Sequence, residues 1–432
     1  MTQAGECSAA ALDKRYLWHP FTPMADWDSP EHQPLVIVSG SGALLRDQHG
    51  SEYIDGNSTI WTNIHGHNHP RINAAICGQL ARIAHVSALG FANEPAALLG
   101  QRLVDSYPGA SLNRVFYSDD GSTAIEVAVK LAIQFWQQVG EPRRTRFVAF
   151  ERAYHGDTMG ATSLGGVKAF HSRFSDYHFP VDFIESLDGL GRLADPGRVA
   201  AVVIEPLIRG VAGMRPWPPG MLRELRAWCD AHDVLLIADE IMTGFGRTGS
   251  LFACPRENVV PDMVALAKGI TGGYLPLAAT LVDQRVYDAF LGGPERAFYY
   301  GHSYTANPLG CAAALASLDL FDEERTLDRL QPKIARLGRL LDDLAAHPNV
   351  RDTRQLGFIA GIEIGRADGQ PFDPALRMGA AACSAARGHG LLTRPILDTI
   401  TLMPPLCITC GQLEQAVDAI RRGIDAACSR HC

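Results

Sequence analysis

The segment Val234-Leu235-Leu236-Ile237-Ala238-Asp239-Glu240 places an unbroken apolar run directly before two carboxylates. Such a run is typical of a strand that is buried on both faces, as in a parallel sheet. Downstream, Lys268 stands in Ala265-Leu266-Ala267-Lys268-Gly269-Ile270-Thr271-Gly272-Gly273, between a second apolar run and several glycines. In a parallel α/β sheet, ligands bind beyond the carboxyl ends of the strands, so both segments predict a site at one edge of a sheet.

Asp239 and Lys268 together indicate a site for pyridoxal phosphate (PLP). A carboxylate at the end of a buried strand can keep the pyridinium nitrogen protonated, and a lysine amine can condense with the cofactor's aldehyde. Each of the two segments is common by itself. The alternatives are a strand that ends in solvent and a lysine at the end of a helix or strand. The order of the two segments and the motifs around them favour the cofactor site.

The composition indicates an ordinary globular enzyme. The chain has 432 residues, which predicts two domains, and 47% hydrophobic with 20% charged residues, typical of a folded protein. A net charge of −8 without a basic block predicts neither a nucleic-acid partner nor a membrane surface. The N-terminal residues show no secretory pattern, so we expect a cytoplasmic protein. The ten cysteines have no framework spacing and are expected to be reduced.

The order of apolar runs predicts the fold class. Between Arg114 and Asp283, short runs alternate with amphipathic stretches such as Leu222, Leu225 and Cys229, which share one helix face. This alternation predicts an α/β domain with a mostly parallel sheet. The six predicted strands cover residues 115–117, 147–150, 199–204, 234–238, 263–266 and 277–281.

The C-terminal part changes character and predicts a smaller α+β domain, with helices up to residue 345, a strand over 357–363 and a closing helix. We therefore expect three parts. Residues 1–65 form an N-terminal segment that packs with the small domain, residues 66–315 form the large α/β domain, and residues 316–432 form the small domain.

Polar residues follow the predicted strands at the expected site edge. Asp120, Gly121 and Ser122 open a helix, whose free N–H groups suit a phosphate; the alternative is a plain loop with Ser122 as N-cap. Tyr154 follows the next strand and offers a flat ring for stacking. Glu205 ends the strand before Asp239, and two adjacent carboxylates favour a cation between them, although solvated strand ends are the alternative.

Two further segments carry polar groups. Gly301, His302 and Ser303 precede an Asn-Pro helix start and could add hydroxyl and backbone donors to a phosphate. The alternating histidines over residues 65–69 suggest a metal, but no cysteine or carboxylate stands at zinc-like spacing. We predict no metal site and expect a turn before a helix there.

Taken together, these motifs make the chain resemble the fold-type I, class III PLP-dependent aminotransferases over nearly its whole length. More narrowly, it resembles the branch of diaminopelargonate synthases in biotin biosynthesis. The matching segments are Leu17-Trp18-His19-Pro20-Phe21-Thr22, Ile64-His65-Gly66-His67-Asn68-His69-Pro70, Tyr154-His155-Gly156-Asp157-Thr158, Thr243-Gly244-Phe245-Gly246-Arg247-Thr248-Gly249, Lys268-Gly269-Ile270-Thr271-Gly272-Gly273-Tyr274, Thr393-Arg394-Pro395 and Met403-Pro404-Pro405.

The resemblance implies a role for each site residue. Lys268 would bind PLP covalently and carry protons, and Asp239 would pair with the ring nitrogen. Tyr154 would stack on the ring. The phosphate would lie at Asp120, Gly121 and Ser122, with His302 and Ser303 supplied by the second subunit of a homodimer. The residues expected around the cofactor and the substrate also include Glu205, Phe21, Ile60, Trp61, Asp157, Gly301 and Arg394, the last for the carboxylate of the keto acid.

The resemblance also implies small-molecule substrates: 8-amino-7-oxononanoate as acceptor and S-adenosylmethionine as default amino donor. Phe21, Ile60 and Thr401 depart from the adenosylmethionine-using pattern, which has Tyr, Trp and Tyr there. Losing an aromatic face and two hydroxyls weakens contact with a bulky sulfonium donor. L-lysine as donor, and a general ω-amino acid or diamine aminotransferase, therefore stay open, as does a catalytically inactive scaffold.

Overall fold

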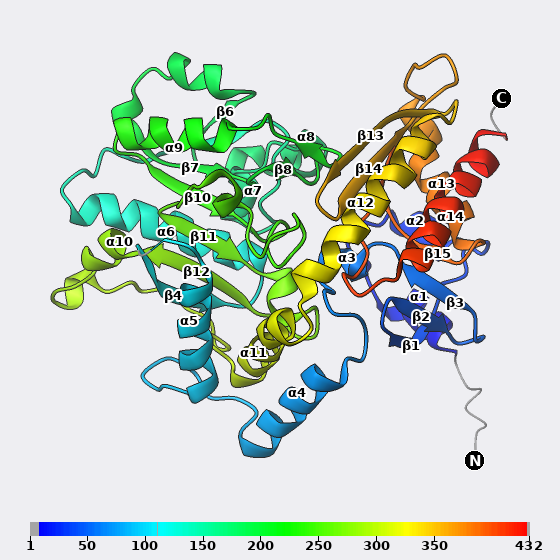
Figure 1. The fold of residues 1–432 in the computed structure, drawn as a ribbon. Coiled ribbons are helices and arrows are strands. Elements are labelled where there is room, and N and C mark those ends of the chain that lie inside the picture. The colour runs from blue at the N-terminus through cyan, green and yellow to red at the C-terminus, as the bar shows by residue number, and fades with distance from the viewer. Residues whose placement is uncertain (1–7, 110, 430–432) are drawn as a thin grey trace.

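The computed structural model describes residues 8–109 and 111–429. Residues 1–7, on which part of the cytoplasmic prediction depends, lie outside this range. The chain forms a large α/β unit on one side and a smaller unit on the other, with the long helix α12 (Thr326–Ala345) lying between them in the view of Figure 1. Among the described residues, none of the helices combines the length and the apolar character needed to span a bilayer.

A seven-stranded sheet organises the large unit. Its order is β4-β12-β11-β10-β7-β5-β6, and only β12 runs antiparallel to its neighbours. The strands are β4 (Leu112–Ser118), β5 (Arg146–Phe150), β6 (Val181–Ile184), β7 (Val199–Ile204), β10 (Leu235–Asp239), β11 (Met263–Leu266) and β12 (Ala278–Asp283). All six strands predicted here are present, and the expected α/β class with a mostly parallel sheet is confirmed; β6 was not predicted.

Both faces of this sheet are covered, which explains the continuous apolar runs. Along β5, Phe147 and Ala149 pack into one hydrophobic cluster, whereas Val148 and Phe150 pack into another. Helices lie on both sides of the sheet (Figure 1). The α-helices of the large unit are α4 (Pro70–Arg82), α5 (Glu94–Ser106), α6 (Gly121–Gln138), α7 (Met159–Ser163), α8 (Lys168–His171), α9 (Met221–Ala231), α10 (Gln284–Asp288) and α11 (Pro308–Glu323).

The start of α6 corrects one alternative from the sequence. Asp120, not Ser122, is the N-cap. Its carboxylate accepts a hydrogen bond from the backbone N of Thr123 at 2.9 Å, and the Thr123 hydroxyl accepts one from the backbone N of Asp120 at 3.0 Å, which together form a capping box. Asp120 occupies the N-cap position because its carboxylate reaches the N–H three residues further on, whereas Ser122 already lies inside the first helical turn. The N–H groups of Gly121 and Ser122 are thereby left for another partner.

The small unit contains an antiparallel sheet in the order β13-β14-β17-β16. The closing helix α14 (Cys410–Cys428) packs on α13 (Met378–Arg387) and buries Leu413, Val417 and Ile420, as its periodicity predicts. The strands are β13 (Val350–Leu356), β14 (Ile359–Ile364), β16 (Pro395–Ile396) and β17 (Thr399–Leu402).

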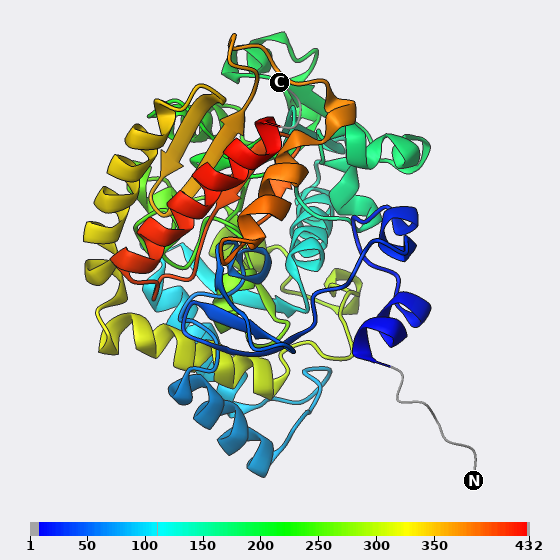
Figure 2. The ribbon, with the colours of Figure 1, turned by 90° about the vertical axis from the view of Figure 1, so that its right-hand side faces the viewer.

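The N-terminal strands share a sheet with the C-terminal part. Strand β15 (Leu391–Leu392) pairs in parallel with β3 (Glu52–Asp55), which continues to β2 (Leu44–Asp47) and β1 (Ile37–Ser41). Figure 2 shows β1 and β2 near α13 and α14. The domain limits stay predictions; the limit after residue 315 lies inside α11. The remaining short α-helices and β-strands are α1 (Ala9–Tyr16), α2 (Met24–Asp28), α3 (Ser58–Trp61), β8 (Ile208–Arg209) and β9 (Arg215–Pro216).

Candidate active site

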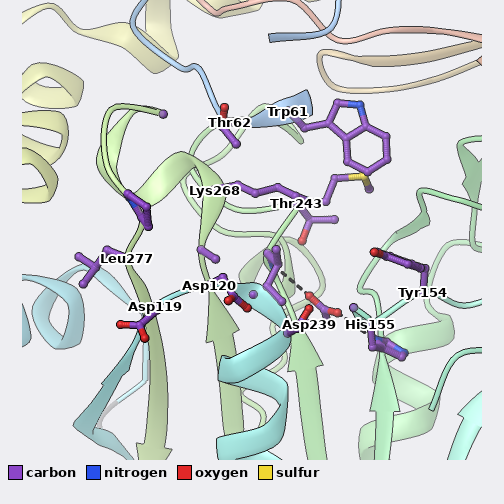
Figure 3. A pocket seen from close by; sticks show the side chains of 18 of the residues that line it. Trp61, Thr62, Asp119, Asp120, Tyr154, His155, Asp239, Thr243, Lys268 and Leu277 are labelled. Atoms are coloured by element: carbon purple, nitrogen blue, oxygen red, sulfur yellow. Dashed lines mark hydrogen bonds and ion pairs between the residues drawn. The ribbon is translucent and has the colours of Figure 1, made fainter. Parts of the chain in front are cut away.

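A cavity of about 450 Å³ lies at the carboxyl edge of the large sheet. The residues that follow β4, β5, β7, β10 and β11 all line it, because parallel strands deliver their ends to one edge. Predicted site residues in its lining are Trp61, Asp120, Gly121, Ser122, Tyr154, Glu205, Asp239 and Lys268. In Figure 3, Asp119 and Leu277 lie on one side of this cavity, and Tyr154 and His155 lie on the other.

Lys268 stands where β11 passes into a short 3₁₀ turn, in a left-handed backbone conformation (φ 47°). Its Nζ lies 4.6 Å from the centre of the Trp61 ring. Burial lowers the pKa of the Lys268 amine to about 8, partly opposed by the charges of Asp239 and Glu205. A partly neutral amine in a cavity can act as a nucleophile and as a proton carrier.

Asp239 is held rigidly at the end of β10. Nδ1 of His155 lies 2.7 Å from Oδ2 of Asp239, and the backbone N of Ile241 donates to Oδ1 at 3.1 Å. His155 is buried, with 2% of its surface exposed, and Asp239 has 4% exposed. The pair forms a charge-assisted contact that fixes the carboxylate at the cavity floor.

Glu205 supports the neighbouring loop. Its two carboxylate oxygens accept hydrogen bonds from the backbone N of Tyr154 at 3.2 Å and of Gly210 at 2.9 Å. Burial raises the pKa of Glu205 to about 7, against the lowering influence of His155. Tyr154 in turn donates from its hydroxyl to Asp157 at 2.5 Å, and burial raises the pKa of this phenol.

The N-terminus of α6 closes one end of the cavity. Ser122 accepts a hydrogen bond from the backbone N of Asp157 at 3.1 Å. Gly156 has φ +122°, and a Cβ on it would stand 2.2 Å from Oγ of Ser122. Glycine is therefore required for the loop after β5 to approach the helix start, where N–H groups and the helix dipole suit an anion.

An apolar wall lies opposite the strand ends. It is formed by Trp61, Met242 and Val211, within a hydrophobic cluster that also includes Ile208 and Met403. Met242, with 6% of its surface exposed, packs tightly on Gly210, where a Cβ would stand 2.6 Å from the sulfur. This wall suits the carbon chain of a substrate better than a polar group.

Seven predicted site residues do not line the cavity in this single chain. Asp157 contacts Tyr154 from outside, and Ile60 is 44% exposed beside Trp61. His302 lies with Nδ1 3.3 Å from Asp119 of the same chain. The other four are exposed at the surface: Phe21, Gly301, Ser303 and Arg394. Their predicted roles stay predictions.

The cavity fits PLP by its chemistry. It brings together a reactive lysine, a buried carboxylate for a ring nitrogen, and helical N–H groups for a phosphate. Within the described part of the chain, the buried hydroxyl of Thr243, which lines the cavity, has no hydrogen-bond partner. Buried polar groups without partners are rare in proteins, so this one favours a polar ligand.

Comparison with known families agrees with this chemistry. Residues 27–424 match the family described as "Aminotransferase class-III". The chain is a class-III aminotransferase. Enzymes of this family depend on PLP, so the predicted cofactor and enzyme class are confirmed.

Relatives of this aminotransferase cover nearly its full length. The adenosylmethionine-8-amino-7-oxononanoate aminotransferase of Geobacter sulfurreducens is 46% identical, over 95% of this chain and 96% of its own. The enzyme of the same name from Nitratidesulfovibrio vulgaris is 47% identical, over 96% and 81%. The crystal structure of the enzyme so named from Methanocaldococcus jannaschii superposes with a TM-score of 0.92, at 38% identity over 96% and 98%. The expected fold-type I architecture is thereby confirmed.

Three residues that shape the site of this aminotransferase received no role from the sequence: His155, Thr243 and Met242. His155 was part of a quoted motif but received no role, and only its contact with Asp239 assigns one. Thr243 and Met242 follow β10 and line the cavity. Their positions after the Asp239-Glu240 strand end were a usable signal, because residues beyond a strand end point toward the site.

Proposed function

We propose that this aminotransferase transfers an amino group to 8-amino-7-oxononanoate and so forms 7,8-diaminopelargonate in biotin biosynthesis. Relatives with 42–47% identity over nearly the whole chain, which carry this activity in their names, support the assignment. The structural observation that carries it is Lys268 in a cavity between the Asp239 carboxylate and the apolar wall of Trp61 and Met242. S-adenosylmethionine is the proposed default donor.

The site residues have separate roles in transamination. Gly121 and Ser122 hold the phosphate of PLP through N–H groups, and Asp239, oriented by His155, holds the ring nitrogen in its protonated form. When bound, PLP supplies an electron sink that stabilises negative charge on a substrate carbon. At Nζ of Lys268, a pKa near 8 leaves a useful fraction neutral, so the amine can accept a proton from that carbon and return one.

The substrate end of the site belongs to the proposal as well. Trp61 and Met242 exclude water from the side of Lys268 and accommodate the aliphatic chain of the keto acid. Arg394 is exposed, and within the described residues its guanidinium has no ion-pair partner, so it is free to bind the carboxylate at the far end of that chain.

We further propose a homodimer in which His302 and Ser303 of one subunit complete the phosphate site of the other. The exposed loop around Gly301, flanked by Tyr299 (84% exposed) and Tyr304 (61% exposed), supports this proposal, since exposed aromatic side chains favour association. Size measurement in solution tests it: a monomer at working concentration contradicts it. The cytoplasmic location stays a prediction.

The donor is the least constrained part of the proposal. Thr401, where an aromatic hydroxyl is common, is buried, and its hydroxyl donates to the carbonyl of Arg394 at 2.8 Å. It is therefore not available to a donor molecule. Offering S-adenosylmethionine, L-lysine, putrescine and 4-aminobutyrate separately to the PLP-loaded enzyme, and following the loss of its visible absorption, identifies the donor. Rapid conversion by the last two alone would instead favour a general ω-aminotransferase.

The pathway is tested in cells. Expression of this chain in a bacterial strain that lacks this step of biotin synthesis should restore growth without biotin. The Lys268→Ala variant, expressed at the same level, should not. Failure of the well-expressed wild-type chain to restore growth would contradict the biotin assignment while leaving the aminotransferase class intact.

A further inference from the structure

The segment that carries Trp61 has an unusual backbone. Four consecutive residues, Ser58, Thr59, Ile60 and Trp61, have φ values of 47°, 51°, 63° and 67°, and none is glycine. Together they form one turn of left-handed helix, labelled α3 in Figure 1. Side chains of L-residues crowd the following carbonyl in this conformation, so it persists only where surrounding contacts impose it.

Asp55 supplies the contacts inside this turn. Its Oδ1 accepts the backbone N–H of Thr59 at 3.0 Å, and its Oδ2 accepts the Thr59 hydroxyl at 2.9 Å. Nε2 of His67 lies 2.9 Å from the same Oδ2 and fixes the carboxylate from the other side. Asp55 itself has only 3% of its surface exposed, whereas Thr59 is exposed, so these hydrogen bonds are partly shielded from water.

The turn determines where the Trp61 ring lies. The indole N–H donates to the side-chain oxygen of Asn57 at 2.8 Å, and the Trp61 backbone N donates to the Asn57 carbonyl at 2.8 Å. The Trp61 ring and Lys268 lie on the same side of the cavity in Figure 3. Nζ of Lys268 is 4.6 Å from the centre of this ring. A shift of the turn to a right-handed conformation would remove this contact.

Most other anchors hold the two ends of the turn, while the Thr62 hydroxyl also reaches the Thr59 carbonyl, at 3.1 Å. At its start, the Ser58 hydroxyl donates to the carbonyl of Met403 at 2.7 Å. At its end, the buried guanidinium of Arg247 donates to the carbonyls of Trp61 at 3.3 Å and Asn63 at 2.8 Å. Neither contact reaches Thr59 or Ile60. Asp55 is thus the side chain that binds both the backbone N–H and the hydroxyl of Thr59 in the interior of the turn.

We propose that Asp55 is a positioning residue of the active site: it holds residues 58–61 in a left-handed turn and thereby places the Trp61 ring against the Lys268 amine. The catalytic consequence of this contact depends on the proposed transamination, whereas the position of the ring does not. Asp55 itself touches neither the cavity nor the reacting atoms.

The test uses Asp55→Asn in the full chain, with Asp47→Asn as matched control. Asp47 is 4% exposed on the same sheet and accepts backbone N–H groups of His49 and Ser51 and the hydroxyl of Tyr53, but contacts no residue of the turn. The readout is the near-ultraviolet circular dichroism of the cofactor-free protein. The band of Trp61 is defined as the part lost in Trp61→Phe.

Asp55→Asn should lose more than half of that band and roughly tenfold in kcat/KM, because a hydrogen-bonded buried charge is removed. Asp47→Asn should keep the band. Adding Thr59→Gly to Asp55→Asn should restore most of the band, since glycine adopts the left-handed conformation without strain. A wild-type protein that shows the Trp61 band but transaminates with none of the donors would leave this inference standing and contradict the proposed function.

Three results would overturn the inference: a full Trp61 band in Asp55→Asn, an equal loss in Asp47→Asn, or no recovery with Thr59→Gly. If Asp55→Asn does not fold, the double variant Asp55→Asn/Thr59→Gly tests the inference instead. A folded double variant with the Trp61 band supports the role of Asp55 in the turn, and failure of the double variant to fold counts against it.

Discussion

Replacing His155 with phenylalanine should weaken PLP binding without unfolding the protein. Phenylalanine keeps an aromatic ring at this position, slightly larger than the imidazole, but it cannot donate a hydrogen bond to Oδ2 of Asp239, which lies 2.7 Å from Nδ1 of His155. Asp239 keeps only the backbone N–H of Ile241, at its other oxygen. The carboxylate is then free to turn away from a ring nitrogen.

The size of the effect follows from the type of hydrogen bond lost. A hydrogen bond to a charged group contributes about 1.5–3 kcal/mol. Since about 1.4 kcal/mol changes an equilibrium constant tenfold, the Kd for PLP should rise roughly 10- to 150-fold if the whole contribution orients Asp239. This is an upper range, because part of the contribution stabilises the cofactor-free protein as well.

The assay is a titration of cofactor-free protein with PLP, followed by the visible absorption of the bound cofactor. His65→Phe is the matched control, because His65 is also buried (6% exposed) and hydrogen-bonded, through Nε2 to Ser317 at 3.2 Å, but lies outside the cavity lining. Equal affinities of the two variants for PLP would refute the role of His155. A melting curve for each variant checks that both remain folded.

Three further predictions concern crowding and protonation. The Gly156→Ala variant should bind PLP more weakly and melt at a lower temperature, because the added Cβ would stand 2.2 Å from Oγ of Ser122. The control is Gly140→Ala, which is also at positive φ but has open space around it and should lose only a little stability. Equal effects of the two substitutions would contradict this prediction. The pKa of Glu205 in the folded protein is about 7, above its usual 4.5, so folding takes up a proton between these two values. The stability of the wild-type protein should therefore fall as the pH rises from 5 to 8. The Glu205→Gln variant should show a flatter dependence of melting temperature on pH in this range. The Lys268 amine in cofactor-free protein should react with an amine-directed reagent with a midpoint near pH 8, and a midpoint above pH 10 would contradict its lowered pKa.

The sequence predicts the sheet well because the sheet is buried on both faces. Strands β7 and β11 have the predicted bounds, since every residue in them is apolar and buried. Strand β6 escaped prediction because it is a short edge strand containing Asp182 and a partly exposed Phe183. Strand β13 escaped for a similar reason: it carries several charged residues that face solvent or pair across the sheet.

The site residues could be predicted from the sequence where a reactive side chain directly follows a predicted strand. Asp239 and Lys268 line the cavity as expected. The role of His155 could not be read from its neighbours, because only tertiary structure brings it to Asp239 across 84 positions of the chain. The left-handed turn at residues 58–61 has no glycine or asparagine to signal it, and its contacts with Met403 and Arg247 come from distant parts of the chain.

The most direct test of the proposed function is product formation by the purified protein. With PLP, 8-amino-7-oxononanoate and a donor amine, mass spectrometry should detect 7,8-diaminopelargonate, and the Lys268→Ala variant should form none. The absence of this product with every donor offered, from a wild-type protein that binds PLP and shows its visible absorption, would contradict the proposed function.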